Sequence, residues 1–352
     1  MSGNNSKNKK SKLNITKFNN DYIYEQKEKN NIKEKGINNG KKEEIINTDT
    51  KLKQIFSIKE HNDWVESVKI FPSGNIISVS YDRSINIFDG NNYNILQNIK
   101  NAHNQNIIYL AIKDENNFAT CSYDRCISIW TKNKNNFIKD KSIFNAHKAK
   151  INCLIYLLNN KIISCSTDRT IKIRELNNNK YQLITSIKFN YDNNNNDLLS
   201  LLLLEDKNIL VNAGENGTFF WKITKEGIII KFNHRFSNAI CTCWNGLNRI
   251  DEDRIIVGCE EELNIISIKD KNIIKTIIIP FRCNGIISIK EKGIFLYGGW
   301  SKNIKIYRND NYECLSTIEN AHQEYIVGFC QLKNGLILSF SGDCTMIIWS
   351  IK

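Results

Sequence analysis

The sequence lacks several features that mark membrane, secreted and metal-binding proteins. None of its 352 residues belongs to an uninterrupted apolar run of 18, so no membrane-spanning helix is expected. The chain opens MSGNNSKNKK without an apolar segment, and no secretory signal is expected. The eleven cysteines include no CxxC pair, and the CxC at Cys241 and Cys243 has no two further ligands at a spacing that suits zinc. We interpret the cysteines as small buried residues of a reducing compartment and predict no metal site.

Proline is scarce, with two residues, whereas Asn, Ile and Lys are abundant. The formal net charge is +12. A basic chain can bind nucleic acid or an acidic membrane surface. The same charge follows from a compositional bias that inflates Lys without selection for a basic patch. We favour the compositional interpretation and predict no specific nucleic-acid contact.

Residues 1–50 differ from the rest of the chain. They are rich in Lys and Asn and have few apolar residues at any fixed period. Such a segment cannot bury enough surface to offset its ordering entropy, so we predict a disordered tail. The cluster Lys9, Lys10 and Lys12 resembles a nuclear import signal, but a solvated charge run explains it as well. The cytoplasm is the expected location, with the nucleus as the alternative.

From Lys51 onward the sequence predicts a series of short strands. Apolar and polar residues alternate in runs such as SVKIF, IISVS, FATCS and LILSF. Alternation over four to eight residues rich in Ile, Val and Phe is typical of strands. No convincing helix of ten residues appears after the tail. The sequence therefore predicts an all-β domain.

One short sequence motif recurs along this domain. VSYDRSINIF begins at Val79, CSYDRCISIW at Cys121 and CSTDRTIKIR at Cys165. Taking the turn residue as a landmark, seven copies separated by 41 to 47 residues begin their turns at Asp82, Asp124, Asp168, Glu215, Glu260, Ser301 and Asp343. A period of ~40–45 residues with about four strands per repeat is typical of a β-propeller. We predict seven blades.

A second regularity connects histidines to these turns. In four repeats a His lies 21 residues before the turn Asp, and a hydroxyl lies four residues before it. With these residues the chain resembles the WD40-repeat family across residues 51–352. The resemblance implies that each His lies between the turn carboxylate and the strand hydroxyl, with a Trp N–H extending the network. The residues concerned are His61, Ser78 and Asp82; His103, Thr120, Asp124 and Trp130; His147, Ser164 and Asp168; and His322, Ser339, Asp343 and Trp349.

A Ser, His and Asp set invites comparison with a hydrolase triad. A catalytic triad is needed once, whereas four copies in one register indicate a structural role. No Gly-rich phosphate loop or isolated acid–base pair appears, so we predict neither an enzyme nor a bound cofactor. Blades four to six have Asn194, Ala239 and Pro280 where the His would stand. We expect these blades to depend on packing alone, with lower order at residues 193–196.

The ring needs a closing strand. The last repeat ends with MIIWSIK and lacks a fourth strand, while residues 51–59 have no blade of their own. The resemblance implies that this segment joins the last blade, which removes an open sheet edge. Leu52, Ile55 and Ile58 are the expected apolar positions.

The resemblance also implies a function in protein–protein interaction. We predict a non-catalytic scaffold or recognition subunit, monomeric within a hetero-complex, whose partner carries acidic or phosphorylated groups. Aromatic and basic residues flank the turn acids and the histidines on the face that the family commonly uses. They are Trp64, Tyr81, Arg83, Tyr123, Arg125, Lys150, Arg169, Trp300 and Tyr325.

Two other functions are weighed against this one. Phosphoinositide-binding propellers carry an FRRG motif, and the nearest text here, Phe281-Arg282-Cys283-Asn284, lacks the second Arg. Substrate-recruiting subunits of ubiquitin ligases often carry WDxR at the end of a repeat, and no repeat end in this chain matches it. Both functions remain alternatives.

Overall fold

The computed structural model describes residues 50–157, 160–189, 197–224, 229–237, 239–241, 243 and 245–352, with the backbone alone described at 229–233. The predicted tail over residues 1–50, apart from Thr50, and the expected loose loop at 193–196 lie outside these residues. Thr50 itself is buried, and its carbonyl oxygen accepts a hydrogen bond of 2.7 Å from Ser316 Oγ. Thr50 therefore belongs with the ring, one residue earlier than the predicted boundary.

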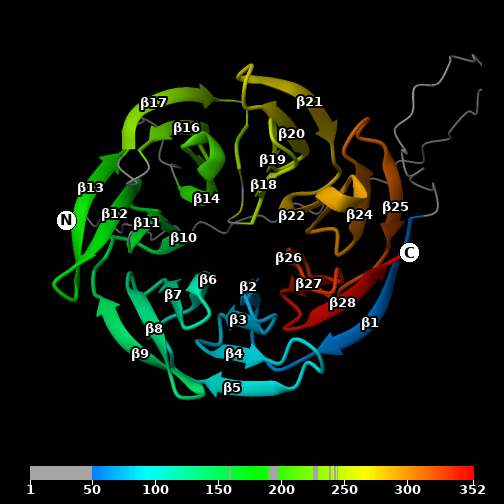
Figure 1. Ribbon diagram of the computed structural model, residues 1–352. Coiled ribbons are helices and arrows are strands. Elements are labelled where there is room, and N and C mark those ends of the chain that lie inside the picture. Colours follow the sequence, from blue (N-terminus) through cyan, green and yellow to red (C-terminus); the bar gives the residue numbers. More distant parts are fainter. Residues whose placement is uncertain are drawn as a thin grey trace, which may run out of the picture. The chain divides into compact units, whose positions relative to one another are not determined.

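The described residues from Thr50 to Lys352 form a closed ring of seven four-stranded antiparallel sheets, which confirms the predicted seven-bladed all-β propeller (Figure 1). We number the sheets as blades along the chain. Blades 1 to 3 consist of β2 (Val65–Ile70), β3 (Ile76–Ser80), β4 (Ile85–Phe88) and β5 (Ile95–Ile99); β6 (Ile107–Asp114), β7 (Asn117–Ser122), β8 (Ile127–Asn133) and β9 (Asn136–Ile143); and β10 (Ile151–Leu157), β11 (Lys161–Ser166), β12 (Thr170–Asn177) and β13 (Lys180–Lys188).

The remaining blades follow the same order. Blades 4 to 6 consist of β14 (Leu198–Leu204), β15 (Ile209–Gly214), β16 (Gly217–Ile223) and β17 (Ile229–Phe236); β18 (Leu247–Arg249), β19 (Arg254–Gly258), β20 (Glu262–Ser267) and β21 (Asn272–Ile278); and β22 (Cys283–Ile289), β23 (Ile294–Gly299), β24 (Ile304–Arg308) and β25 (Cys314–Ile318). Blade 7 consists of β26 (Ile326–Gln331), β27 (Ile337–Ser341), β28 (Met346–Ile351) and β1 (Leu52–Ile58). In the described part of the chain the helical segments are two 3-10 turns, η1 (Glu205–Lys207) and η2 (Lys290–Lys292), and no helix could span a membrane.

The core lies between neighbouring blades. The second strand of a blade is buried on both faces, as in β3, where all five residues are buried. The outermost strand is largely exposed, as in β5 and β13. Ile77 and Ile85 of blade 1 pack in one cluster with Leu110 and Phe118 of blade 2. Each blade therefore depends on its neighbours for burial, which is the physical reason for a closed ring.

The strand that closes the ring comes from the other end of the propeller. β1 pairs antiparallel with β28, and Lys51 N donates to Lys352 O over 3.1 Å. Leu52 and Ile58 are buried as expected, but the expectation for Ile55 was wrong, because its side chain is 50% exposed. Ile55 is the residue that a register shift between Gln54 and Phe56 leaves out of the pairing with β28, and it lies in the exposed middle of β1.

Candidate interaction face

Four copies of one hydrogen-bond network connect loops within the blades. In blade 2, His103 Nδ1 lies 3.0 Å from Asp124 Oδ2 and His103 Nε2 lies 2.8 Å from Thr120 Oγ1. Trp130 Nε1 donates to the same Thr120 oxygen over 2.9 Å. This arrangement fits a neutral imidazole that donates through Nδ1 and accepts through Nε2. The network joins the loop before the first strand of the blade to the turn after its second strand.

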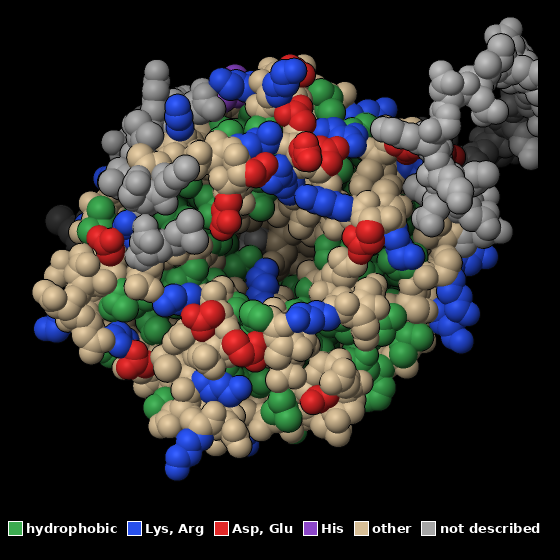
Figure 2. All heavy atoms as spheres, viewed as in Figure 1, with side chains coloured by type: hydrophobic (Ala, Val, Ile, Leu, Met, Phe, Trp, Pro, Cys, Tyr) green, Lys and Arg blue, Asp and Glu red, His purple; other side chains and the backbone are tan. Residues whose placement is uncertain are grey.

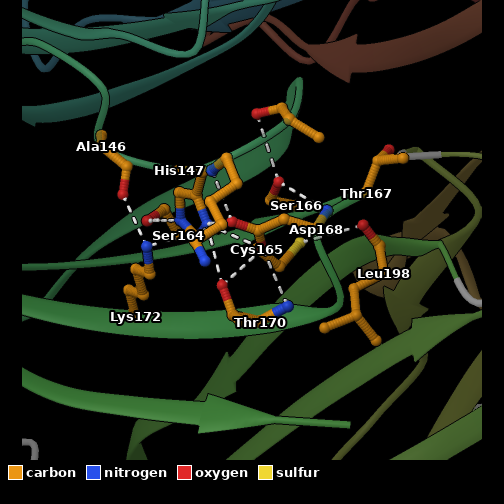
Figure 3. Close-up of polar contacts among 12 residues, drawn as sticks. Ala146, His147, Ser164, Cys165, Ser166, Thr167, Asp168, Thr170, Lys172 and Leu198 are labelled. Carbon is orange, nitrogen blue, oxygen red and sulfur yellow. Dashed lines mark hydrogen bonds and ion pairs between the residues drawn. The ribbon is translucent and has the colours of Figure 1, made fainter. Parts of the chain in front are cut away.

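The other three copies have the same geometry. The distance from His Nδ1 to a carboxylate oxygen is 3.0 Å for His61 to Asp82, His147 to Asp168 and His322 to Asp343. The distance from His Nε2 to the hydroxyl is 2.7 Å for His61 to Ser78, 2.8 Å for His147 to Ser164 and 2.7 Å for His322 to Ser339. Figure 3 shows the blade 3 copy, in which Asp168 also accepts from the backbone N–H of Thr170.

Only two of the four networks include a Trp donor. Trp130 and Trp349 donate to Thr120 and Ser339, respectively, within the networks of blades 2 and 7. Blade 1 has the buried Phe88 at that position, and blade 3 has the buried Arg174, which donates to the carbonyl of Ala146 instead. The His and Asp contacts therefore form without the Trp.

The surroundings of the network shift the pKa values of its members. Burial alone would raise the pKa of Asp124, but hydrogen bonds from His103 and from two backbone N–H groups outweigh it, and the pKa falls to about 2. The pKa values of Asp82, Asp168 and Asp343 are also held well below the usual range. Burial lowers the pKa of His147, although Asp168 opposes this shift. The networks thus favour an ionised Asp, and the blade 3 network favours a neutral His.

The expectation that blades 4 to 6 depend on packing alone was wrong for blades 4 and 5. In blade 4, Trp221 Nε1 donates to Asn212 Oδ1 over 2.6 Å, which reproduces the contact of Trp130 with Thr120. The Trp and its acceptor are separated by nine residues in blade 4 and by ten in blade 2. A comparison of the repeats at one constant spacing therefore does not identify Asn212 as the acceptor. In blade 5, Asn264 Nδ2 donates to Glu262 Oε1 over 2.7 Å and Thr276 Oγ1 donates to Asn264 Oδ1 over 2.7 Å.

The structure brings five aromatic residues of the predicted face into one continuous arc. The centroid of the Tyr325 ring lies 6.3 Å from that of Trp300 and 5.0 Å from that of Trp64. Trp64 stacks on Tyr81 at 4.9 Å, and the Tyr81 hydroxyl lies 2.9 Å from that of Tyr123. Blades 6, 7, 1 and 2 each contribute to this surface, which we call the aromatic arc. It consists of Trp300, Tyr325, Trp64, Tyr81 and Tyr123.

The basic residues of the predicted face lie differently. Lys150 Nζ lies 5.2 Å from the centroid of the Tyr123 ring, and so extends the aromatic arc to blade 3. Arg83, Arg125 and Arg169 follow the turn Asp with positive φ angles of 67°, 67° and 66°. Arg83 and Arg125 are exposed, and none of the three lines the cavity described next.

A cavity of about 420 Å³ lies beside the aromatic arc, lined by Trp64, Glu66, Tyr81, Cys243, Arg282, Asn284, Trp300, Lys302, Glu324, Tyr325 and Val327. Four of these residues were predicted from the sequence: Trp64, Tyr81, Trp300 and Tyr325. The sequence reasoning missed Glu66, Arg282, Lys302 and Glu324. Glu66 is 1% exposed. The sequence could have indicated it, because it is a carboxylate at the otherwise apolar start of β2.

The charged groups of the cavity occupy different parts of its wall. Lys302 Nζ lies 3.8 Å from Glu324 Oε1 at the exposed edge. Arg282 lies over the ring of Trp300, with its guanidinium carbon 6.0 Å from the centroid. The remaining acid, Glu66, lies near Tyr81 and Tyr325: burial first, and the charge of Glu66 second, raise the pKa of both phenols well above the usual range. On the face seen in Figure 2, the centre of the ring is hollowed and side chains of both signs surround the hollow.

Comparison with known families agrees with this architecture. The family model described as WD domain, G-beta repeat matches residues 52–89, 95–131 and 138–175. These matches cover the first three of the four networks. No curated protein sequence matches the chain at a significant level. The chain therefore contains sequence matches to the WD40 repeat at three positions within a seven-bladed β-propeller.

Proposed function

We propose that this protein is a non-catalytic recognition subunit of a multiprotein assembly and that it binds its partner through the aromatic arc. WD40 propellers are generally protein-interaction scaffolds. The observation that carries the proposal is the continuity of the arc across four blades, with Trp300 59% and Trp64 37% exposed. Trp and Tyr dominate the energetics of protein interfaces when a partner removes them from water. The fourfold recurrence of the His and Asp contact supports a bracing role for these residues.

The proposal includes an acidic or phosphorylated group on the partner. Arg83, Arg125 and Arg169 belong to three adjacent blades, and the first two are exposed. Guanidinium groups form strong bidentate hydrogen bonds with carboxylates and phosphates. Lys150 lies 3.8 Å from Asp197 Oδ2, so its charge is partly compensated within the protein. The two exposed arginines, Arg83 and Arg125, therefore support this part of the proposal more strongly than Lys150 does.

The proposal is tested by affinity capture of partners with the wild type and two variants. We expect the double variant Trp64→Ala, Arg125→Ala and the single variant Trp300→Ala to lose the partners that the wild type captures. The control is Phe56→Ala, because Phe56 is an aromatic residue that is 44% exposed on β1, outside the arc. Unchanged partners in both arc variants, or equal loss in the control, would show that another face is used.

A further inference from the structure

The cavity beside the aromatic arc has walls suited to a positively charged group. Trp64 and Tyr81 stack with an interplanar angle of 26°, while Tyr325 meets Trp64 edge-on at 84°. Two ring orientations therefore border one space. The faces of aromatic rings carry negative electrostatic potential and attract cations within about 6 Å of the ring centroid.

The cavity already contains one contact of this type within the protein. The guanidinium of Arg282 lies over Trp300, on the blade 6 side. Among the described residues, no Lys or Arg lies over the rings of Trp64, Tyr81 and Tyr325, on the blade 7 and blade 1 side. On the blade 6 side, a cation of the protein itself thus lies over the Trp300 ring, whereas the three rings on the other side have no described Lys or Arg over them.

The buried acid lies on the blade 1 side. Glu66 belongs to β2, directly after the loop that carries Trp64, and it lines the cavity although it is 1% exposed. A carboxylate away from water interacts with an approaching charge more strongly than an exposed one does. The second acid, Glu324, lies near Lys302 at the exposed edge of the cavity. Because the Lys302 charge partly offsets that of Glu324, Glu324 contributes less to the electrostatic potential within the cavity.

The volume limits the size of the ligand. About 420 Å³ is near the lower end of the range of about 300–1,000 Å³ for small-molecule sites. One long side chain of a partner fits this space better than a folded element does. Lys and Arg have aliphatic stems that pack on aromatic rings while the charged end reaches further.

We propose that the cavity receives a basic side chain from the partner, with its stem against Trp64, Tyr81 and Tyr325 and its charged end toward Glu66. The proposal rests on the proposed function and specifies the chemistry of the partner. The partner then presents a basic residue to the cavity and acidic or phosphorylated groups to the arginines outside it. A partner of mixed charge satisfies both surfaces.

The test compares two tripeptides that differ in charge at one position. Acetyl-Ala-Arg-Ala-amide is the charged probe, and the same peptide with citrulline in place of Arg is its neutral match. Binding to the full chain is followed by calorimetry and by tryptophan fluorescence, and the difference between the wild type and Trp300→Phe gives the contribution of Trp300 among the six tryptophans. We expect the arginine peptide to bind about tenfold or more tightly than the citrulline peptide, as charge-assisted contacts imply.

Two variants locate the source of this preference. Glu66→Gln keeps the size of the side chain and removes its charge, so we expect the preference for the arginine peptide to disappear. Glu252→Gln is the control, since Glu252 is exposed in blade 5, and it should retain the preference. Equal binding of the two peptides to the wild type would overturn the proposal, whatever the stability of the variants. A preference that persists in a folded Glu66→Gln variant would overturn it as well.

The outcomes separate this inference from the function on which it rests. If Trp300→Ala loses the captured partners while Glu66→Gln retains them, and the peptides bind equally, the arc is a partner surface and the cavity does not select a cation. If the double variant Trp64→Ala, Arg125→Ala and the single variant Trp300→Ala retain all partners while the arginine peptide binds selectively, the cavity binds cations but the proposed function fails.

Discussion

At the scale of single residues, the His and Asp contacts decide how firmly the loops of a blade are held. Each His ring is buried, and each Asp accepts from the ring and from backbone N–H groups. Removing one partner leaves a buried polar group without its contact, which is more costly than losing an exposed hydrogen bond. The recurrence of the same distances in four blades is the physical argument for a structural role.

We expect Asp124→Asn to lower the free energy of unfolding by about 1–3 kcal/mol, because the His103 ring loses a charged acceptor. Urea denaturation followed by circular dichroism measures the change. Asp140→Asn in the same blade is the control: Asp140 is a surface residue whose side chain is 40% exposed, and its replacement should stay within about 0.5 kcal/mol of the wild type. Similar losses in both variants would contradict the special role of Asp124.

Acidification should lower the free energy of unfolding of the propeller in two stages. The folded pKa of His147 lies below its ordinary value of 6.5, so the unfolded chain binds more protons below neutral pH and stability falls between about pH 7 and 5. The pKa of Asp124 is about 2 in the folded state against 3.8 ordinarily, so a second loss follows as the pH drops below about 4. Urea midpoints at pH 7, 5 and 3.5 measure both stages.

The variants assign the two stages to their residues. In Asp124→Asn the stage below pH 4 should become shallower, because one carboxylate with a lowered pKa is gone. In His147→Gln the stage between pH 7 and 5 should become shallower. A wild-type midpoint that rises as the pH falls from 7 to 5 would show that other groups dominate the titration.

At the scale of strands, the pairing of β1 with β28 closes the sheet of blade 7. Without β1, the backbone groups of β28 would form an open edge, and the buried side chains of Leu52 and Ile58 would be missing from their clusters. The strand is short, yet it connects the two ends of the ring.

Deletion of residues 51–59 should therefore lower the midpoint of thermal unfolding by several degrees or more, since a loss of 1 kcal/mol shifts it by about 2–4 °C in a chain of 150–250 residues. Deletion of residues 1–45 is the matched control and should leave the midpoint unchanged. Differential scanning calorimetry compares the two truncations. Equal midpoints would refute a closing role for β1.

The strands of this protein were predictable because local patterns specify them. Alternating apolar residues and a constant distance between turns predicted seven blades, and the matching His and Asp positions predicted four networks. Two errors came from single-residue shifts. Ile55 is the residue that the register shift in β1 leaves out of the pairing with β28, and the contact of Trp221 with Asn212 spans nine residues where that of Trp130 with Thr120 spans ten. A fixed spacing cannot detect a bulge or a shortened turn.

At the scale of the whole molecule, ring closure brings together residues that no local pattern connects. Trp64 and Trp300 lie far apart in the sequence, yet Tyr325 of blade 7 contacts both. The sequence predicted these three residues individually from their places beside the turns and histidines. It did not predict the cavity, because Glu66, Arg282 and Glu324 come from different blades and follow no common spacing.

The networks are also distributed unevenly around the ring. Blades 7, 1, 2 and 3 carry the His and Asp contacts, and these four blades are consecutive in the closed ring. Blades 4, 5 and 6 have other polar contacts but lack a His at the corresponding position. One continuous part of the propeller is thus braced at every blade, and the aromatic arc runs from blade 6, outside this part, into it.

We expect this asymmetry to appear in amide hydrogen exchange. Local opening of a blade requires its loops to separate, and the His and Asp contacts oppose that separation. Amides of the second strands β3, β7, β11 and β27 should therefore exchange more slowly than those of β15, β19 and β23, as mass spectrometry of peptic fragments measures. His103→Gln should raise exchange in β7 while leaving β19 unchanged, which ties the difference to the network rather than to strand burial. Equal protection of both groups in the wild type would mean that packing between blades, not the networks, controls local opening.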